Sequence, residues 1–428
     1  MKFGGSCLRD YLSLDRVREI VEMWKNQTII VSALSGITDY LNSTSSLDME
    51  YVWKRHEIKF KNSLLKERYK KELMEKASRL SSLYLKFNIE HNQRIKAEIL
   101  SYGERLSALM LKFYLLDSGK DSEVFDSDRL GIVADGEIMN STVDLERSRS
   151  RVVLNLKDIS EDKILIITGF FAINSHEEVC LLGRNGSDVT AAAIASILNC
   201  RNVTFYKDVP GLMNAPPEIV EYPQKMKKVD YLTAYRMARL GAKIVNPLAL
   251  KMLWENGITA EIRGMYSEFP DTIISVEAQD RIFGINLMND AVLVKVNVER
   301  KKGLDRKIPS ISNEFSIVGW YKEKQYLTLI TDRNIEEKKN EIFKLLGEPN
   351  VEYGVKVASI VYSGGQMKQI INEIIETIGR EYGIKPRISK DAVLFPFKGD
   401  AHPLIRSLHS TLSNYANDSK LYEEVARP

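Results

Sequence analysis

Strand-like and helix-like segments alternate through about the first 275 residues, and this order constrains the fold more than any other feature. Apolar runs at 29–31 and 203–209 have the composition of buried strands, and the continuous run 163–173 predicts one strand buried on both faces. Residues 100–116 repeat apolar side chains at helical spacing, and 189–198 form an Ala-rich segment typical of a helix. Alternation of this kind predicts an α/β fold with a mostly parallel sheet flanked by helices.

After about residue 285 the order of the segments changes. Strand-like segments lie at 291–298, 326–331, 355–362 and 392–397, and helical ones lie at 335–346, 367–382 and around 404–412. Two rounds of strand, helix and strand predict two small α+β modules. Because 428 residues exceed the usual size of one hydrophobic core, we expect a first domain over 1–280 and the paired modules over 285–428.

The composition is that of a globular protein without a strong charge preference. Apolar residues make up 44% and charged residues 28%, and 61 Lys and Arg against 58 Asp and Glu give a net charge of +3. This balance does not indicate a nucleic-acid partner. The basic stretch 51–87 contains acidic residues throughout, which favours a pair of solvated amphipathic helices over a nucleic-acid or membrane helix.

The spacing of the cysteines and the length of the apolar runs indicate the cellular compartment of the protein. Cys7, Cys180 and Cys200 form no CxxC pair, so we expect neither a disulfide framework nor structural zinc, and we assign no metal-ligating residues. The N-terminus has no apolar signal region, and no apolar run approaches the roughly 18–20 residues that span a bilayer. We therefore expect a soluble, cytoplasmic protein.

Two Gly-containing clusters have the composition of anion sites. In Lys2-Phe3-Gly4-Gly5-Ser6 the glycines let the backbone approach a phosphate, and the lysine supplies positive charge, although most such Gly pairs are turns. The segment Gly183–Asp188 opens the Ala-rich helix, where free amides attract an anion. Ser187 and Asp188 are also ordinary N-cap residues, but Arg184 suits a carboxylate ligand and favours a binding site.

Two further clusters are ambiguous when taken alone. Glu104, in the segment 101–107, lies in what we expect to be the first turn of a helix, where the helix dipole is a sufficient explanation for a carboxylate. Its alternative role is to pair with a substrate ammonium. The segments 207–211 and 241–243, which contain Lys207, Asp208 and Lys243, are unremarkable in isolation.

In their order and spacing these clusters resemble the aspartate kinase family. The matching motifs are KFGGS, SGIT (Ser35 to Thr38), SYGERLSA, LGRNGSD, KDVPG and LGAKIVNP (Leu240 to Pro247). LGRNGSD and SYGERLSA are specific to that family, whereas KFGG and GAK are shared with other amino-acid kinases. Residues 262–274 resemble the strand and turn that close the family's catalytic domain, and the C-terminal part, with Leu408-His409, looks like its paired ACT regulatory domains.

The resemblance implies an amino-acid-kinase-type sheet over 1–280 followed by two ACT-type modules over 285–428. It implies transfer of the γ-phosphoryl group of ATP, with Mg²⁺, to the side-chain carboxylate of L-aspartate. The product would be 4-phospho-L-aspartate, the entry to lysine, threonine and methionine biosynthesis. Because the acceptor is already a carboxylate at neutral pH, no general base is required, and catalysis would be positioning plus charge neutralisation.

The resemblance also implies a role for each matching residue. The catalytic residues would be Lys2, on the transferring phosphoryl group, Lys243, and Asp188, which would orient the lysines or a magnesium-linked water. Glu104 would bind the ammonium of aspartate and Arg184 a carboxylate. The residues that hold aspartate would be Thr38, Glu104, Arg184 and Ser187, and those that bind ATP would be Lys2, Gly4, Gly5, Ser6, Lys207, Asp208, Met213 and Lys243.

Several positions depart from the family pattern. Ser6 and Cys7 replace Thr-Ser, which keeps the first hydroxyl, and Asn246 replaces a His before Pro247. Met213 stands where Tyr is common. Pro216-Pro217-Glu218 replaces Asp-Pro-Arg, and because a carboxylate would repel phosphate, we expect Glu218 to point into solvent.

Two alternatives to an aspartate kinase remain open. One is another acyl-phosphate-forming amino-acid kinase, such as a glutamate or acetylglutamate kinase, against which SYGERLSA and the ACT-like tail argue. The other is a catalytically weak paralogue that acts as an amino-acid-sensing regulatory protein, for which Met213 and Glu218 are the best support.

The C-terminal part is the basis for our expectations about partner chains and effectors. The all-Ile face of 367–382 and the resemblance predict a homodimer, or a dimer of dimers, built through residues beyond about 285, with lysine or threonine as effector. No nucleic acid and no membrane is expected as a partner. The basic stretch 298–320 looks short for a complete first module.

Overall fold

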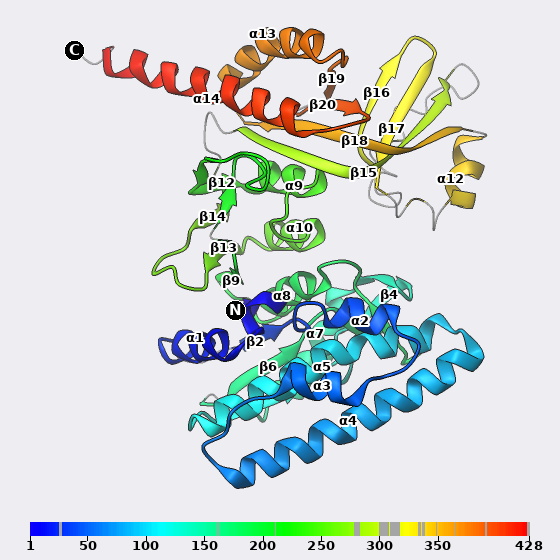
Figure 1. Cartoon of the computed structure of the whole chain (residues 1–428), viewed down its shortest axis with the longest axis vertical. Coiled ribbons are helices and arrows are strands. Elements are labelled where there is room, and N and C mark those ends of the chain that lie inside the picture. Colours follow the sequence, from blue (N-terminus) through cyan, green and yellow to red (C-terminus); the bar gives the residue numbers. More distant parts are fainter. Residues whose placement is uncertain are drawn as a thin grey trace. The chain divides into compact units, whose positions relative to one another are not determined.

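The chain forms two compact units, Met1–Leu212 with Val245–Val276 and Met213–Ile244 with Glu277–Pro428 (Figure 1). In this computed structural model the described residues are 1–24, 28–160, 162–209, 211–277, 283–298, 308, 317–332, 335, 339–347, 349–363, 365–389 and 392–425. The basic stretch 298–320, named above, lies mostly outside the described residues.

The first unit alternates short strands with helices. Its elements are β1 (Lys2–Phe3), a 3₁₀ turn η1 (Gly5–Leu8), α1 (Tyr11–Glu22), β2 (Thr28–Val31), α2 (Ile37–Ser43), α3 (Met49–His56), α4 (Ser63–Glu90), α5 (Gln93–Asp117), β3 (Ser122–Phe125), α6 (Ser127–Leu130), β4 (Ala134–Glu137), β5 (Asn140–Val143), α7 (Leu145–Leu156), β6 (Ile164–Thr168), β7 (Phe171–Ile173), β8 (Val179–Leu181), α8 (Gly186–Ile197), β9 (Asn202–Lys207), α10 (Pro247–Glu255), β13 (Thr259–Gly264) and β14 (Thr272–Ser275).

The main sheet of this unit is mostly parallel. Its strands follow the order β14-β13-β9-β1-β2-β6-β3, and among these β14 is antiparallel to its neighbour β13. The short central strand β1 pairs in parallel with β2 on one side and with β9 on the other. The chain therefore leaves β1 in one direction and later returns to its other side. In such sheets ligands bind outside the carboxyl ends of the strands at the point where the order reverses.

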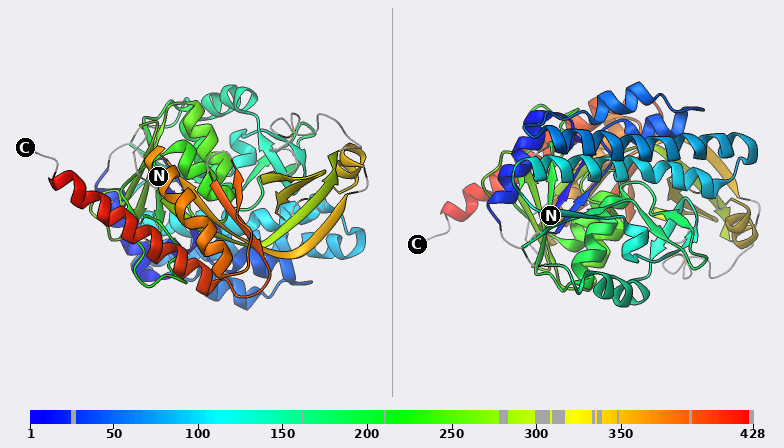
Figure 2. Two further views of the ribbon diagram at one scale, coloured as in Figure 1. Left: turned by 90° about the horizontal axis from the view of Figure 1, so that it is seen from above. Right: turned by 90° about the horizontal axis from the view of Figure 1, so that it is seen from below.

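Helices cover both faces of the sheet, as the alternation predicted (Figure 2). Ile29 and Val31 point into the same core as α1 and α5, whereas Ile30 is buried on the opposite side of β2. Helix α8 packs against β1, β2 and β9, and α10 packs against α8. The predicted α/β fold class is therefore confirmed for the first unit.

Two boundaries differ from the prediction. Helix α5 begins at Gln93 rather than near residue 100, because the Asn92 side chain caps it by accepting from Arg94 N. The run 163–173 is not one strand: β6 ends at Thr168, and Phe170 adopts a positive φ of 75° that turns the chain into β7, which pairs with β8 in a separate sheet. Apolar composition alone cannot mark such a break.

The basic stretch 51–87 folds as the expected pair of amphipathic helices, α3 and α4. The side of α4 that faces α5 buries Tyr69, Leu73, Leu80 and Tyr84, while its charged residues lie outward or along the edges of the contact. No helix in the described part of the chain combines the length and the apolar character needed to cross a membrane.

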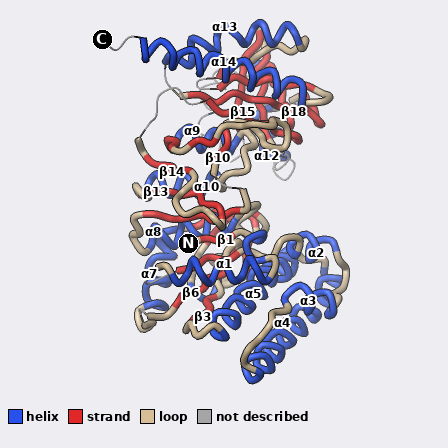
Figure 3. The backbone as a smooth tube through the Cα atoms, turned by 60° about the vertical axis from the view of Figure 1, so that its left-hand side comes forward, coloured by secondary structure: helices blue, strands red, loops and turns tan. Residues whose placement is uncertain are grey.

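The second unit is built on an antiparallel sheet with strand order β16-β17-β15-β18-β20-β19 (Figure 3). Its elements, after β10 (Leu212–Met213) at the unit boundary, are β11 (Lys225–Met226), β12 (Lys228–Asp230), α9 (Tyr231–Arg239), β15 (Phe283–Asn297), β16 (Ile317–Glu323), β17 (Tyr326–Thr331), α12 (Lys339–Leu346), β18 (Asn350–Tyr362), α13 (Gly365–Glu381), β19 (Arg387–Ser389), β20 (Ala392–Phe397) and α14 (His402–Val425).

Two separate hydrophobic cores lie along this one sheet. Phe283 and Ile285, in the first half of β15, join the core formed with α13 and α14, whereas Val292 and Val294, in its second half, join the core that contains α12. The two small α+β modules are thus present, as predicted. They share the long strands β15 and β18, which the sequence does not indicate because Asn289 and Asp290 interrupt the apolar pattern.

The Ile-rich face of α13 is covered within the chain. Ile371, Ile374, Ile375 and Ile378 are buried in the core shared with α14 and β18. This face therefore no longer argues for a partner chain, since its own unit already removes it from water. The sequence pattern also places Met367 on this face, but its side chain lies outside the described residues.

Candidate active site

The loops after the parallel strands of the first unit meet at one edge of the sheet. Gly4 N donates to Tyr206 O at 3.4 Å, Ser35 N donates to Gly5 O at 3.3 Å, and Gly169 N donates to Val31 O at 2.9 Å. These bonds bring together the segments that follow β1, β2, β6 and β9. Gly5 has no room for a side chain, because a Cβ atom there would lie 2.3 Å from Ala33 O.

A buried ion pair is formed by Lys2, one of the two residues of the short strand β1. Lys2 Nζ is 2.8 Å from Asp188 Oδ1, and the two side chains are 9% and 2% exposed. Burial alone would raise the pKa of Asp188, but the charges of Lys2 and Lys207 hold it below its usual range. The aspartate is therefore ionised at neutral pH and fixes a lysine at the carboxyl edge of the sheet.

Lys207, at the end of β9, is a second cation close to this pair. Burial lowers its pKa, the negative charge of Asp188 raises it, and the neighbouring charge of Lys2 lowers it again. Asp208 is exposed, and its Oδ1 accepts from Val209 N at 3.2 Å. Lys2 and Lys207 therefore place two cations at one edge of the sheet, and cations there favour a phosphate group.

Helix α8 directs its N-terminus at the same edge of the sheet. Asn185 occupies the N-cap position at φ 58° without a side-chain cap, so Ser187 and Asp188 do not act as capping residues, contrary to one reading of the sequence. Ser187 is buried against Gly169, where an added Cβ would approach Ser187 Cβ to 2.5 Å. Arg184 is exposed, and its guanidinium has no ion-pair partner among the described residues.

Asn246 connects these parts, and sequence reasoning treated it only as a departure from the family pattern. Its backbone N donates to Asp188 Oδ2 at 3.1 Å, and its Nδ2 donates to Arg184 O at 2.9 Å. Its Oδ1 caps α10 by accepting from Leu248 N. The Asn-Pro pair that opens α10 was a signal of a helix start, but its bond to Asp188 depends on tertiary contact.

Glu104 reaches the site from the middle of α5. The helix begins at Gln93, so our placement of Glu104 in a first turn was wrong, and the helix dipole does not explain it. Its Oε1 accepts from Ala33 N at 2.9 Å, while Oε2 is buried and has no hydrogen-bond partner among the residues that the structure describes. Burial raises the pKa of Glu104 to about 8, against the lowering effects of the Ala33 bond and the charge of Lys2.

The remaining site residues of the first unit lie on the connecting loops and turns. Ser6 lies in η1 and is half-buried, and Thr38 is half-buried in the first turn of α2, which begins after Gly36 at φ 82°. Ser107, which we had not singled out, accepts from Leu34 N at 3.0 Å and helps Glu104 to hold the loop after β2.

Met213 and Lys243 belong to the second unit. Met213 lies in β10, and Lys243 Nζ is 3.2 Å from Glu218 Oε1, with side-chain exposures of 87% and 55%. Glu218 is thus exposed, as expected, and it is paired with a lysine. The ion pair is open to water and contributes little to stability.

Taken together, the first unit offers an anion site beside a carboxylate. Lys2, Lys207 and the N-terminus of α8 supply positive charge, and Arg184 adds a guanidinium that has no ion-pair partner in the described part of the chain. Glu104 adds an acceptor oxygen without a partner. Such an arrangement suits transfer of a phosphoryl group to an acceptor that carries both an ammonium and a carboxylate.

Comparison with known proteins identifies the class of protein that has this fold and site. The model of the amino acid kinase family matches residues 1–264. The chain belongs to the amino acid kinase family.

The curated relatives that part of the chain matches are aspartokinases. The chain is 32% identical over 162 residues to the aspartokinase of Bacillus sp. strain MGA3, which covers 37% of this chain and 39% of the relative. It is 26% identical over 184 residues to an aspartokinase of Thermus thermophilus, covering 42% and 44%, and 31% identical over 164 residues to that of Corynebacterium glutamicum, covering 38% of each. The matched part therefore spans about two-fifths of these relatives.

Solved structures show the same fold along the chain. Aspartokinase III of E. coli in complex with aspartate and ADP matches with a TM-score of 0.82 at 19% identity, covering 96% of this chain and 98% of the other. The aspartate kinase of Clostridium acetobutylicum matches with a TM-score of 0.67 at 20% identity, covering 96% and 99%. The likeness extends over the kinase-type sheet and the six-stranded ACT-like region.

Proposed function

We propose that this family member is an aspartate kinase that phosphorylates the side-chain carboxylate of L-aspartate with ATP to give 4-phospho-L-aspartate. The observation that carries the proposal is the buried pair of Lys2 and Asp188 at the carboxyl edge of the sheet, beside the N-terminus of α8. Its curated relatives named above are aspartokinases, and the E. coli enzyme binds aspartate and ADP.

Aspartate would lie between α5 and the N-terminus of α8. Glu104 Oε2, which is buried and has no partner, is the acceptor for the substrate ammonium. Arg184 is the donor for a substrate carboxylate, because a free guanidinium binds a carboxylate through two parallel bonds. Thr38 and Ser187 would complete the site with hydroxyl groups, and the geometry supports this for the buried Ser187 in particular.

The phosphates of ATP would lie over β1 and β9. Lys2 stabilises the transferring phosphoryl group, Asp188 fixes Lys2, and Gly4, Gly5 and Ser6 let the backbone approach closely. Lys207, Asp208, Met213 and Lys243 are proposed to line the nucleotide site on the strength of the motif match. Mg²⁺ would enter with ATP as part of the substrate, since it is held largely by phosphate oxygens and water in such sites.

The reaction needs charge stabilisation rather than proton transfer. The attacking carboxylate is ionised at neutral pH, so its oxygen attacks the γ-phosphorus directly while ADP leaves. Negative charge grows on the transferring group, and Lys2 and the α8 N-terminus are already placed to meet it. Holding both substrates in line supplies much of the remaining rate enhancement.

An ADP-release assay on the purified protein tests the proposed activity. We expect ADP release that depends on L-aspartate and far exceeds the release with glutamate, with acetylglutamate or with no acceptor. Release driven by glutamate or acetylglutamate would assign the chain to another acyl-phosphate-forming kinase. Absence of release with every acceptor, together with amino-acid binding, would favour a regulatory paralogue.

Aspartate binding should depend on pH through Glu104. The carboxyl group has a pKa of about 8 in the free site, and only its ionised form pairs with an ammonium. Affinity for aspartate should therefore rise as the pH rises towards about 8, by up to about tenfold per pH unit. Calorimetric titration with L-aspartate at several pH values measures the slope. In Glu104→Gln the affinity should be low and nearly independent of pH, and a wild-type slope of zero contradicts the assignment.

The C-terminal part is proposed to be regulatory and to form the subunit contact. We propose a catalytic domain over 1–280, paired ACT-type domains over 285–428, a cytoplasmic homodimer or dimer of dimers, and lysine or threonine as effector in the biosynthesis of those amino acids. The lysine-bound form of E. coli aspartokinase III supports lysine as the first effector to test.

Light scattering on the full chain measures the assembly, and a monomer at all concentrations contradicts it. Activity titrated with lysine, with threonine and with both measures the feedback.

A further inference from the structure

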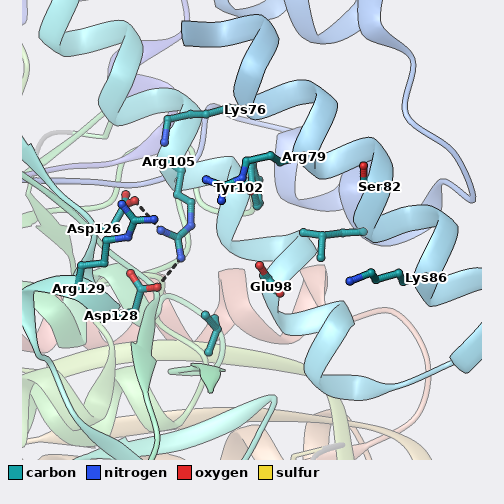
Figure 4. Close-up of a pocket in the computed structure, with 12 residues that line it drawn as sticks. Lys76, Arg79, Ser82, Lys86, Glu98, Tyr102, Arg105, Asp126, Asp128 and Arg129 are labelled. Atoms are coloured by element: carbon teal, nitrogen blue, oxygen red, sulfur yellow. Dashed lines mark hydrogen bonds and ion pairs between the residues drawn. The ribbon is translucent and has the colours of Figure 1, made fainter. Parts of the chain in front are cut away.

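A polar cavity lies between α4, α5 and α6, its lining does not include Glu104, and nothing in the proposed reaction uses it. Its volume is about 290 Å³, close to the lower end of small-molecule pockets at about 300 Å³. Helix α4 lines it with Lys76, Arg79 and Lys86, which follow one another at helical spacing. Helix α5 contributes Glu98, Tyr102 and Arg105, and the segment at α6 contributes Asp126, Asp128 and Arg129 (Figure 4).

Positive charge in this cavity is not neutralised by the chain. Arg105 is held by Asp126 and by Asp128, the latter at 2.8 Å, so these three groups together carry a net charge of −1. Lys76, Arg79, Lys86 and Arg129 have no ion-pair partner among the described residues, and together with Glu98 and the Arg105 cluster they leave the lining with a net charge of +2. Elsewhere on α4 a comparable cation is paired, as Arg68 is with Glu72.

Partial burial makes the positive charge of Lys76 costly. Lys76 is half-buried, and burial lowers the pKa of its ammonium. Lys76 is therefore a half-buried cation without an ion-pair partner in the described part of the chain, and the exposed cations Arg79, Lys86 and Arg129 repel it across the cavity. A bound anion removes both effects, because it supplies the opposite charge inside the cavity.

Two buried carboxylate oxygens in the wall of the cavity lack a hydrogen-bond donor. Asp126 and Asp128 use Oδ2 to bind Arg105, whereas Oδ1 of each is buried with no partner. Asp126 is 9% exposed, so water reaches it poorly. A buried acceptor without a donor costs on the order of 1–3 kcal/mol, and a ligand hydroxyl meets that need when it displaces the side chains that cover these oxygens.

We propose that this cavity binds a small polyanion that also carries a hydroxyl group, such as a hydroxylated polycarboxylate or the phosphate ester of a polyol. The cations of α4 and α6 bind its anionic groups, and the free oxygens of Asp126 and Asp128 accept from its hydroxyl. Arg105 follows Glu104 directly in α5, so the ligand contacts the helix that carries a proposed substrate residue. The inference does not rest on the proposed kinase activity.

Calorimetric titration of the full-length protein without divalent metal tests the proposal. Citrate represents the carboxylate source and glycerol 3-phosphate the phosphate source, so their relative affinities show which anion the cavity prefers. Tricarballylate is the matched control, because it has the three carboxylates of citrate without the hydroxyl. We expect at least one probe to bind, with citrate binding at least about threefold more tightly than tricarballylate. Failure of both citrate and glycerol 3-phosphate to bind overturns the proposal, and equal affinities for citrate and tricarballylate overturn the part assigned to the hydroxyl.

Two double variants, each of which removes two positive charges from α4, test whether the ligand binds in the cavity. The double variant Lys76→Gln/Arg79→Gln should weaken binding by about tenfold or more, since each removes a charged partner. The double variant Lys70→Gln/Lys71→Gln removes two exposed charges of the same helix that do not line the cavity, and it should leave the affinity nearly unchanged. Equal losses in both variants would mean a general charge effect, and no loss in either would put the ligand elsewhere. Both outcomes refute this site.

Discussion

Replacing Lys2 by alanine is expected to lower kcat by about 10²-fold or more, the scale on which one preorganised donor to a transition state contributes. Lys2 Nζ is fixed by Asp188 at 2.8 Å before substrate binds, so no reorganisation is needed when charge develops on the phosphoryl group. Because that charge grows during transfer, the effect should appear in kcat more than in the KM of either substrate. Steady-state kinetics with both substrates measures it.

The folding consequence of the same substitution must be separated from the catalytic one. Lys2→Ala leaves Asp188 buried with one lysine fewer, and breaking a buried ion pair costs on the order of 3–5 kcal/mol. The double variant Lys2→Met/Asp188→Asn removes both charges and should recover most of the lost thermal stability. If kcat stays low although this variant is folded, the loss does not come from unfolding but from the removal of Lys2 and Asp188. A near-normal kcat in a folded Lys2→Ala protein would refute the assigned role.

Arg184→Ala should raise the KM for aspartate by about 10²-fold and the KM for ATP far less. The guanidinium is exposed and has no ion-pair partner in the described part of the chain, so the free protein loses nothing when it is removed. A bound carboxylate, in contrast, loses a bidentate charged partner, which is typically worth a few kcal/mol. Stability should be unchanged, because the fold uses the backbone carbonyl of Arg184, which accepts from Asn246, and not its side chain.

Two controls make the Arg184 result specific. Arg184→Lys keeps the charge but not the planar fork, so it should recover only part of the affinity for aspartate. Arg201→Ala removes another exposed arginine of the same unit and should leave both constants unchanged. If Arg184→Ala raised the KM for ATP and for aspartate equally, the residue would act on the shape of the α8 N-terminus and not on the acceptor.

Helical and strand patterns gave most elements of the first unit but misjudged where some of them begin and end. Helix α8 and strand β9 lie where the Ala-rich and apolar segments predicted them. The start of α5 was missed because Asn92 and the residues after it are polar, so the apolar repeat becomes clear only later in the helix. The break between β6 and β7 was missed because Phe170 adopts a positive φ that an apolar residue rarely takes.

Local sequence determined the chemical character of the site. The Gly pair after Lys2, the Gly-rich start of α8 and the carboxylate of Glu104 are readable as residues suited to phosphate, carboxylate and ammonium. Their shared order also carried the resemblance to the aspartate kinases, because motif order survives where overall identity has fallen. The departures at Met213, Glu218 and Asn246 were visible in the same way.

Tertiary structure decided which of these residues act together. Lys2 and Asp188 are far apart in the chain, and their pairing follows only from the parallel sheet that brings β1 beside the start of α8. The bond from Asn246 N to Asp188, and the raised pKa of Glu104, likewise depend on burial and on neighbours that no local pattern encodes. Sequence fixes the groups a chain can offer locally, whereas long-range packing sets their distances and removes water from them, and these two effects determine their charge and reactivity.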